Sequence, residues 1–148
     1  MDLFLAILHH FAAFGIVAAL SIEVTMLRGT LDAARLARLS RVDLFYALAA
    51  GLVLLAGIGR VLLGPKGTAF YVGNPVFWIK MALIALIAAM SIPPTLRYLR
   101  WARTARSDPL FAPAPGEVAQ TRRLVFWQAH LVLFVLVAAA VMARGIGL

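Results

Sequence analysis

The chain has 148 residues, of which 64% are hydrophobic and only 14% are charged. Soluble domains are roughly half apolar and about a quarter charged, so this composition excludes an ordinary soluble domain and an intrinsically disordered chain. The absence of cysteine excludes disulfides, thiolate metal sites and a cysteine nucleophile. The formal net charge is +8. The positions of the basic residues decide whether this charge indicates nucleic-acid binding or the orientation of a membrane protein.

Four apolar segments are long enough to cross a membrane, at residues 3–27, 43–63, 76–97 and 124–143. A spanning helix needs roughly 20 mostly apolar residues, whereas a spanning strand is about half as long and alternates with polar residues. No Lys or Arg precedes the first segment, and it is too long for the apolar region of a secretory signal peptide. The sequence therefore predicts an all-α integral membrane four-helix bundle, a single domain over residues 1–148.

The basic residues of the connections predict the orientation of the chain. Ten arginines follow the first and third segments: Arg28, Arg35, Arg38, Arg41, Arg97, Arg100, Arg103, Arg106, Arg122 and Arg123. Four basic residues lie towards the other side: Arg60, Lys66, Lys80 and Arg144. By the positive-inside rule, the arginine-rich connections are cytoplasmic and both termini are periplasmic, in a multi-pass protein of the bacterial inner membrane. We expect these arginines to contact anionic lipid headgroups, and we expect no nucleic-acid partner.

Shorter patterns predict local structure in and beside the third segment. The arginines of 97–106 recur every three residues, which predicts a helical extension beyond the membrane with Trp101 at the interface. Pro93 and Pro94 remove two backbone hydrogen-bond donors, which predicts a kink in the helix. The alternative is that this break in the helix lines a polar cavity. The preceding connection, 64–75, is rich in Gly and Pro and predicts two turns.

Small residues four apart let helix backbones approach each other closely in a membrane. Three such pairs predict helix contact faces: Gly15 with Ala19, Ala47 with Gly51, and Ala85 with Ala89. Alanine is common in this chain, so these pairs support a closely packed bundle only in a general way.

Polar residues inside the segments fall into two layers, and ionisable groups at membrane depth mark functional positions by default. The outer layer contains His9, His10, Arg60, Lys80 and Arg144. The inner layer contains Glu23, Asp43, Tyr46, Ser91, Thr95, Gln128 and His130. Of these side chains, we expect His9 and Glu23 not to face lipid.

His9 is the first candidate for a ligand or proton carrier. It precedes Glu23 by 14 residues, which places the two about 40° apart on one helix face, so we expect His9 to point inward. His10 lies about 100° away, towards a neighbouring helix or the headgroups. The alternative role for His9 is a helix-to-helix hydrogen bond.

The cationic outer layer suits an anionic ligand such as haem propionates, a porphyrin acid or a quinone headgroup. Arg60 and Lys80 are the predicted anion contacts, with His9 and His10 beside them as candidate cofactor-binding residues and His9 as the metal ligand. The alternative for the cations is that they extend from helix ends to the headgroups.

His130 cannot easily share one haem with His9. Each lies about 9 Å from its own membrane face, but on opposite sides, which leaves a vertical gap of about 12 Å in a core about 30 Å thick. We therefore expect haem b to have His9 as its histidine ligand. Glu23 and His130 lie at similar inner depth and are predicted to form a polar pair. This pair either acts in catalysis together with His9 or is a buried hydrogen bond that holds two helices together.

A copper site is a further alternative, because thioether and imidazole ligands suit Cu(I). His9, His10, Met81 and Met142 lie towards the outer side, although no Met-x-x-Met cluster is present. No Gly-rich phosphate loop, HExxH motif or nucleophile elbow occurs either, so hydrolase and nucleotide chemistry have no support.

Several motifs resemble a family of bacterial four-helix membrane proteins whose domain is of unknown function. They are Leu8-His9-His10, Glu23, Arg41-Val42-Asp43, Gly57-Ile58-Gly59-Arg60, Gly73-Asn74-Pro75, Phe77-Trp78-x-Lys80, Ser91-Ile92-Pro93-Pro94-Thr95 and Met142-Ala143-Arg144-Gly145. The resemblance covers nearly the whole chain and implies architecture rather than a reaction.

More remotely, the plan resembles the HemJ-type protoporphyrinogen oxidases and the CopD-type copper-resistance membrane proteins. Both pair a histidine in the first helix with a lysine at the start of a later helix, here His9 and Lys80, and the resemblance adds Trp78 to the cofactor-binding residues. The HemJ resemblance implies haem b and redox chemistry, although the stretch 91–95 stands where that family has a further histidine. The alternatives are a non-enzymatic membrane subunit or assembly partner and a copper or small-solute permease, and a four-helix bundle of this size is compatible with a homodimer.

Overall fold

The computed structural model describes residues 2–145, which form five α-helices and no strand. The helices are α1 (Asp2–Met26), α2 (Ala33–Leu63), α3 (Gly67–Val72), α4 (Pro75–Ser107) and α5 (Pro115–Ala143). Four of them, all except α3, are long and apolar enough to cross a membrane. The predicted all-α fold with four membrane helices is therefore confirmed.

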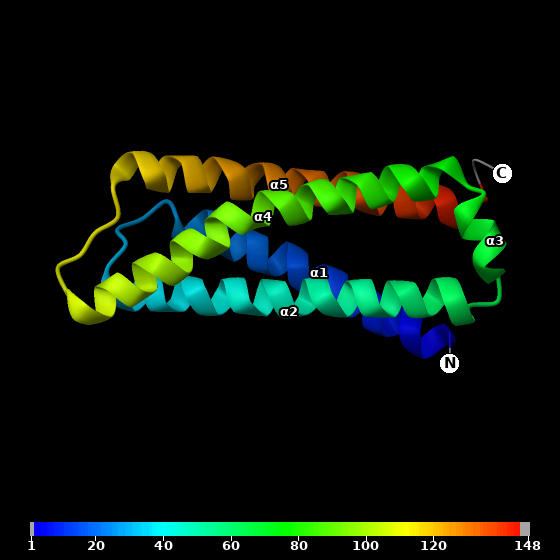
Figure 1. Ribbon diagram of the computed structural model, residues 1–148, viewed down its shortest axis with the longest axis horizontal. Helices are drawn as coiled ribbons and strands as arrows, with labels where there is room; N and C mark the ends of the chain where they lie inside the picture. Colours follow the sequence, from blue (N-terminus) through cyan, green and yellow to red (C-terminus); the bar gives the residue numbers. More distant parts are fainter. Residues whose placement is uncertain (1, 146–148) are drawn as a thin grey trace.

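The molecule has two distinct ends (Figure 1). The start of α1 and the end of α5 lie at the same end as α3, which we call the α3 end. The connections from α1 to α2 and from α4 to α5 lie at the opposite, arginine-rich end. Both ends of the described chain therefore lie at one end of the molecule, which agrees with an even number of spans, and the periplasmic assignment of that end remains a prediction.

The long helices extend beyond the apolar segments at the arginine-rich end. The N-cap of α2 is Asp32, whose carboxylate accepts a hydrogen bond from the Arg35 backbone N–H at 2.7 Å, so the helix begins ten residues before the predicted start at 43. α4 continues to Ser107, which confirms the predicted helical extension. At the α3 end, the connection 64–75 contains the short helix α3 instead of two turns alone.

The bundle consists of two antiparallel hairpins, α1 with α2 and α4 with α5, joined by contacts of α2 with α4 and of α1 with α5. In the first hairpin, a side chain on Gly15 would meet the Phe45 ring at 3.3 Å. Ala19, one turn further along α1, is only 1% exposed. The predicted contact face at Gly15 and Ala19 is therefore confirmed, because small residues let these backbones approach.

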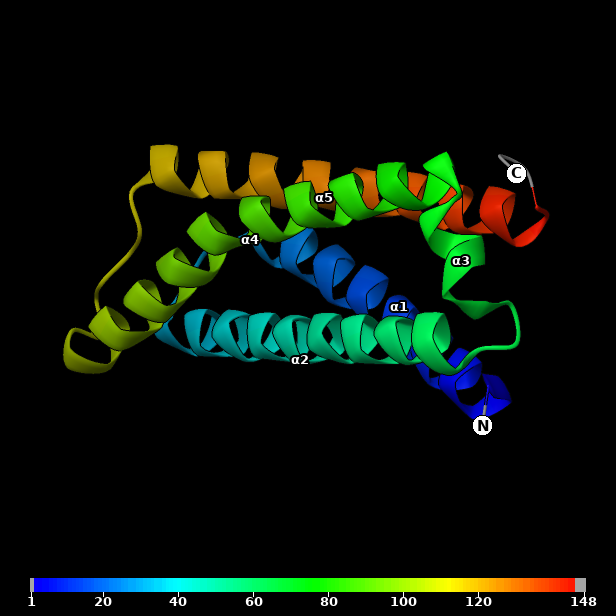
Figure 2. The same cartoon turned by 45° about the vertical axis from the view of Figure 1, so that its right-hand side comes forward.

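α4 is one helix although it contains Pro93 and Pro94. Figures 1 and 2 show that it bends part-way along: its first part runs beside α5, and its later part crosses towards α2. Proline lacks the backbone N–H and its ring crowds the preceding turn, which accounts for such a bend. As a result α2 and α4 separate towards the α3 end (Figure 2).

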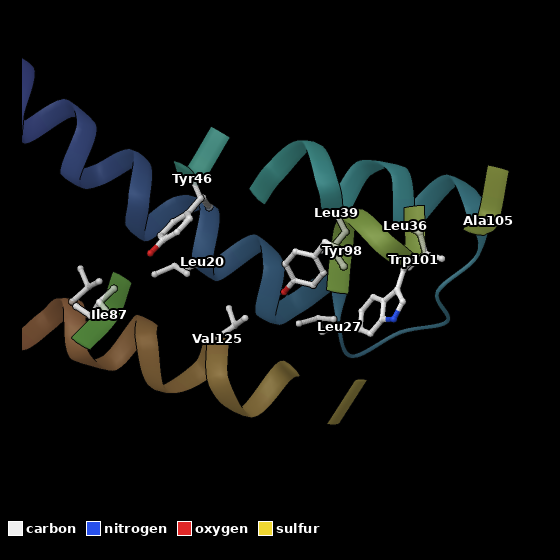
Figure 3. Close-up of a cluster of buried hydrophobic side chains, with 12 residues drawn as sticks. Leu20, Leu27, Leu36, Leu39, Tyr46, Ile87, Tyr98, Trp101, Ala105 and Val125 are labelled. Atoms are coloured by element: carbon white, nitrogen blue, oxygen red, sulfur yellow. The ribbon is translucent and has the colours of Figure 1, made fainter. Parts of the chain in front are cut away.

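The large buried side chains gather in the arginine-rich half of the bundle (Figure 3). The side chains that meet there are Leu20 of α1, Leu27 directly after α1, Leu36 and Leu39 of α2, Tyr98 and Trp101 of α4, and Val125 of α5. Trp101 is 0% exposed, and its indole N–H donates to Glu117 Oε2 at 2.9 Å. It thus packs between helices, and its depth at the membrane interface remains a prediction.

Candidate functional site: an intramembrane cavity

A cavity of about 390 Å³ lies between the four long helices. Most of its wall is apolar, with small residues on α2 and α4 such as Ala50, Gly51 and Ala88. His9 and Lys80 line it at the α3 end, and Tyr46, Ser91 and Thr95 line it towards the arginine-rich end. The lining residues 80–95 of α4 span about 22 Å along the helix. The cavity is therefore elongated, with a lysine and a histidine at one end and hydroxyl groups at the other.

His9 faces the cavity in a fixed tautomer. Its Nδ1 lies 3.0 Å from the carbonyl oxygen of Val53 on α2, and a carbonyl only accepts, so Nδ1 carries a proton and Nε2 is the lone-pair nitrogen of the neutral ring. A Cβ on Gly57 would lie 3.4 Å from His9 Cε1, so the ring packs next to this turn of α2. The predicted inward orientation of His9 is what the structure shows.

His10 faces away from the cavity. It is exposed, and its Nδ1 hydrogen-bonds to the Ala6 carbonyl at 2.6 Å. Its place in the predicted cofactor-binding set is therefore not supported by the geometry, because the 100° step between consecutive helix residues turns it outward.

Lys80 is the cation that lines the cavity. Arg60 does not line it; its Nε lies 3.4 Å from Asp2 Oδ1. Trp78 is 56% exposed and its indole N–H donates to the Val72 carbonyl at 3.0 Å. Two residues along a helix are about 200° apart, so Trp78 and Lys80 point to opposite sides of α4. The structure thus brings together two of the five predicted cofactor-binding residues, His9 and Lys80, and not His10, Arg60 or Trp78.

At the end of the cavity that lies towards the arginine-rich end of the molecule, polar side chains from three helices meet. We call Glu23 of α1, Asp43 and Tyr46 of α2, and Ser91, Thr95 and Tyr98 of α4 the carboxyl cluster. Tyr98 Oη donates to Glu23 Oε2 at 3.3 Å, and Thr95 Oγ1 donates to Asp43 Oδ1 at 2.9 Å. Tyr46 interacts with Ser91. Glu23 is 2% exposed and Asp43 is 5% exposed, so both carboxyl groups are removed from solvent.

The predicted pair of Glu23 and His130 is wrong. His130 is exposed, and its Nδ1 hydrogen-bonds to the Phe126 carbonyl of its own helix at 2.7 Å. The partner of Glu23 is Tyr98, which sequence reasoning missed. The available signal was the spacing of Ser91, Thr95 and Tyr98, which at i, i+4 and i+7 share one helix face.

A family model for predicted membrane proteins, DUF2214, matches residues 1–147. The chain belongs to the DUF2214 family. No curated protein and no solved structure matches the DUF2214 chain. The remote resemblance to HemJ-type and CopD-type proteins therefore has no further support, and the function of the DUF2214 chain has to be argued from its own residues.

Metal binding by the DUF2214 chain depends on which possible ligands lie together. Within residues 2–145, no three His, Asp or Glu side chains come together to hold a metal ion. Met81 and Met142 do not line the cavity with His9. The geometry therefore does not assemble the imidazole and thioether set of the copper alternative.

At the arginine-rich end of the DUF2214 chain, Glu117 joins α5 to the extension of α4 beyond the apolar segment. Besides the Trp101 indole, the guanidinium groups of Arg97 and Arg100 contact its carboxylate. Partial burial works against ionisation, but the hydrogen bonds from Trp101 and Arg100 and the nearby positive charges outweigh it and lower the pKa of Glu117. This network fixes the extension and has no contact with the cavity.

Proposed function

We propose that this DUF2214 protein binds a membrane-soluble anionic cofactor in the cavity, with haem b as the first candidate. One observation carries the proposal: His9 and Lys80 line the same end of an otherwise largely apolar cavity. An ammonium group pairs with carboxylate or phosphate groups, and an apolar wall suits the body of such a ligand. A porphyrin acid or a quinone shares this division into a polar head and an apolar body.

The residues present fit haem in two respects. Ligating histidines usually donate their second ring N–H to a carbonyl or carboxylate, and His9 Nδ1 is held in this way by Val53. Lys80 lies at the same end of the cavity, where it would pair with a propionate. Among the described residues of the cavity wall there is no second histidine and no methionine, so His9 is the residue that would ligate the haem iron. When bound, haem would supply one-electron redox chemistry.

The test is a dithionite-reduced minus oxidised absorption spectrum of the purified protein, expressed with ample haem. We expect a b-type signal that His9→Ala abolishes. His10→Ala and His130→Ala are matched controls, because both rings are exposed and bonded only to their own helices, and both should keep the signal. A flat spectrum from the wild-type protein would exclude haem. Equal loss in all three variants would exclude His9 as the specific ligand.

A non-enzymatic membrane subunit is the second candidate, and one contact favours it. The His9–Val53 hydrogen bond joins α1 to α2, which is what a purely structural histidine would do. In that case His9→Ala lowers the thermal stability of the protein without any spectral signal to lose. Interhelical hydrogen bonds in membranes contribute about 0.6 kcal/mol on average, so the expected loss is small.

A further inference from the structure

The two buried carboxyl groups of the carboxyl cluster lack a cationic partner. Within the described residues 2–145, no Lys, Arg or His nitrogen lies within 4.0 Å of the Glu23 or Asp43 carboxyl oxygens. Glu23 Oε1 is buried and has no hydrogen-bond partner at all. Buried ionised groups are normally paired, and two like charges at one site disfavour double ionisation. Carboxyl groups buried in this way between the helices of a membrane protein commonly mark proton-binding positions.

The cluster is in contact with the cavity through hydroxyl groups. Thr95 lines the cavity and also donates its hydroxyl proton to Asp43 Oδ1 at 2.9 Å. Ser91 and Tyr46 line the same end of the cavity. The Thr95 hydroxyl therefore links the Asp43 carboxylate to the cavity space, whereas Glu23 does not line the cavity and has Tyr98 as its bonded neighbour.

We propose that Glu23 and Asp43 form a proton-binding pair that exchanges its proton with the cavity through the Thr95 hydroxyl. In the exchange step, Asp43 Oδ1 takes the hydroxyl proton of Thr95 while Thr95 Oγ1 takes a proton from a donor in the cavity, such as water or an acidic ligand group. The hydroxyl is unchanged at the end, and one proton has moved to the pair. This inference stands apart from the proposed haem site, because none of its residues is proposed to hold the cofactor.

The surrounding helices contribute few other charges to the pair. On α2 the titratable neighbour is Tyr46, and on α4 they are Tyr98 and Arg97, which act electrostatically on the cluster. The Arg97 guanidinium is engaged by Thr121, Gln120 and Glu117. On α5 the buried polar groups are Gln128 and Thr121, which carry no charge. The pair therefore has no dedicated counter-charge on any helix that packs against it.

The experiment is infrared spectroscopy of the full chain in lipid vesicles near neutral pH, in H₂O and in ²H₂O. We expect the carbonyl band of a protonated carboxylic acid that shifts in ²H₂O. The double variant Glu23→Gln/Asp43→Asn should lose the band, and each single variant should shift or weaken it. Glu117→Gln is the matched control, because this carboxylate lies outside the cluster, and it should leave the band unchanged. These amide substitutions keep the side-chain shape.

Three results would overturn the proposal. The first is the absence of a protonated carboxylic acid from the wild-type protein at neutral pH, a result that does not depend on the folding of any variant. The second is a band that survives in the double variant. The third is a band that sodium ions remove at constant pH, which would make the cluster a metal-cation site instead of a proton site.

The route through Thr95 has its own test. After a rapid pH change, Thr95→Val should slow the change of the carboxylic-acid band roughly tenfold, as expected when a hydrogen bond to a charged group is lost. Thr25→Val is the matched control, since the Thr25 hydroxyl is exposed and donates to the Ser21 carbonyl of its own helix. Equal rates in wild type and Thr95→Val would refute exchange through this hydroxyl.

Discussion

Gly51 is the position at which the cavity can be filled with the least disturbance to the helices. It lines the cavity wall on α2, and a Cβ built there meets no atom within 4 Å. Glycine inside a helix costs about 0.5–1 kcal/mol relative to alanine, and leucine is almost as good a helix former as alanine. Gly51→Ala and Gly51→Leu should therefore both raise the melting temperature, by about 1–4 °C for a chain of this size.

The two variants should differ in ligand binding. Leucine places four carbon atoms in the cavity, and if half of them occupy space that a ligand needs, the ligand loses about 1.6 kcal/mol of contact, or roughly 15-fold in affinity. Alanine adds one carbon at the wall and should change affinity by less than about fivefold. Haem titration of the purified protein, followed by absorption, measures this difference, and thermal unfolding gives the stability.

The control is Ala82→Leu on α4. Ala82 is exposed, does not line the cavity and lies two residues from Lys80, about 200° away on the helix. It should leave both affinity and melting temperature nearly unchanged. Undiminished binding in Gly51→Leu would show that the cavity is not the ligand site, and a lower melting temperature in Gly51→Ala would show that the space beside Gly51 is not open.

Three further predictions concern the rest of the bundle. Glu117→Ala should lower stability by about 1–3 kcal/mol at neutral pH, because the buried Trp101 indole loses its acceptor. Because the pKa of Glu117 is lowered, its contribution to the stability of the folded state is present above the ordinary value of 4.5 and is lost as the pH falls through the folded-state value. The stabilities of wild type and variant should therefore converge in acid. A stability difference that stays constant with pH would contradict this. Gly64→Ala should be destabilising in thermal unfolding, because its Cβ would lie 2.2 Å from the Arg60 carbonyl oxygen, and a wild-type melting temperature would refute the close approach. Arg122→Gln/Arg123→Gln should lower the amount of anionic lipid that co-purifies, at about 1 kcal/mol per arginine near the headgroups, and unchanged lipid content by mass spectrometry would contradict headgroup binding.

The sequence was most informative where one physical constraint acts alone. The thickness of the hydrocarbon core sets the length of an apolar helix, and this is why the four membrane helices could be predicted from their apolar segments. Hydropathy does not mark where those helices end in water, so the start of α2 at Ala33 depends on the Asp32 cap and not on apolar residues. The same limit applies to α3, which is too short to carry an apolar pattern.

The direction in which a side chain points, and the residue with which it pairs, could be predicted only where the residues concerned lie on one helix. The spacing of His9 and Glu23 gave the inward direction of His9, because both residues share one helix and its 3.6-residue period. The partner of Glu23 depends on how α4 is placed relative to α1, and the spacing along one helix contains no information about that placement. Residue depth alone made His130 a plausible partner, but depth does not specify the angle around α5, which turns His130 outward.

The position of the cavity follows from side-chain size together with the bend in α4. Pro93 and Pro94 direct the later part of α4 towards α2, where Tyr98 and Trp101 fill the space between helices (Figures 2 and 3). Before the bend α4 lies farther from α2 (Figure 2), and the facing residues there include small ones such as Gly51 and Ala88. Of the three pairs of small residues, only the one on α1 is a contact face, since Ala47 and Gly51 line the cavity and Ala85 and Ala89 are exposed. A small residue in a membrane helix thus permits either close packing or open space, and the direction of the neighbouring helix decides which.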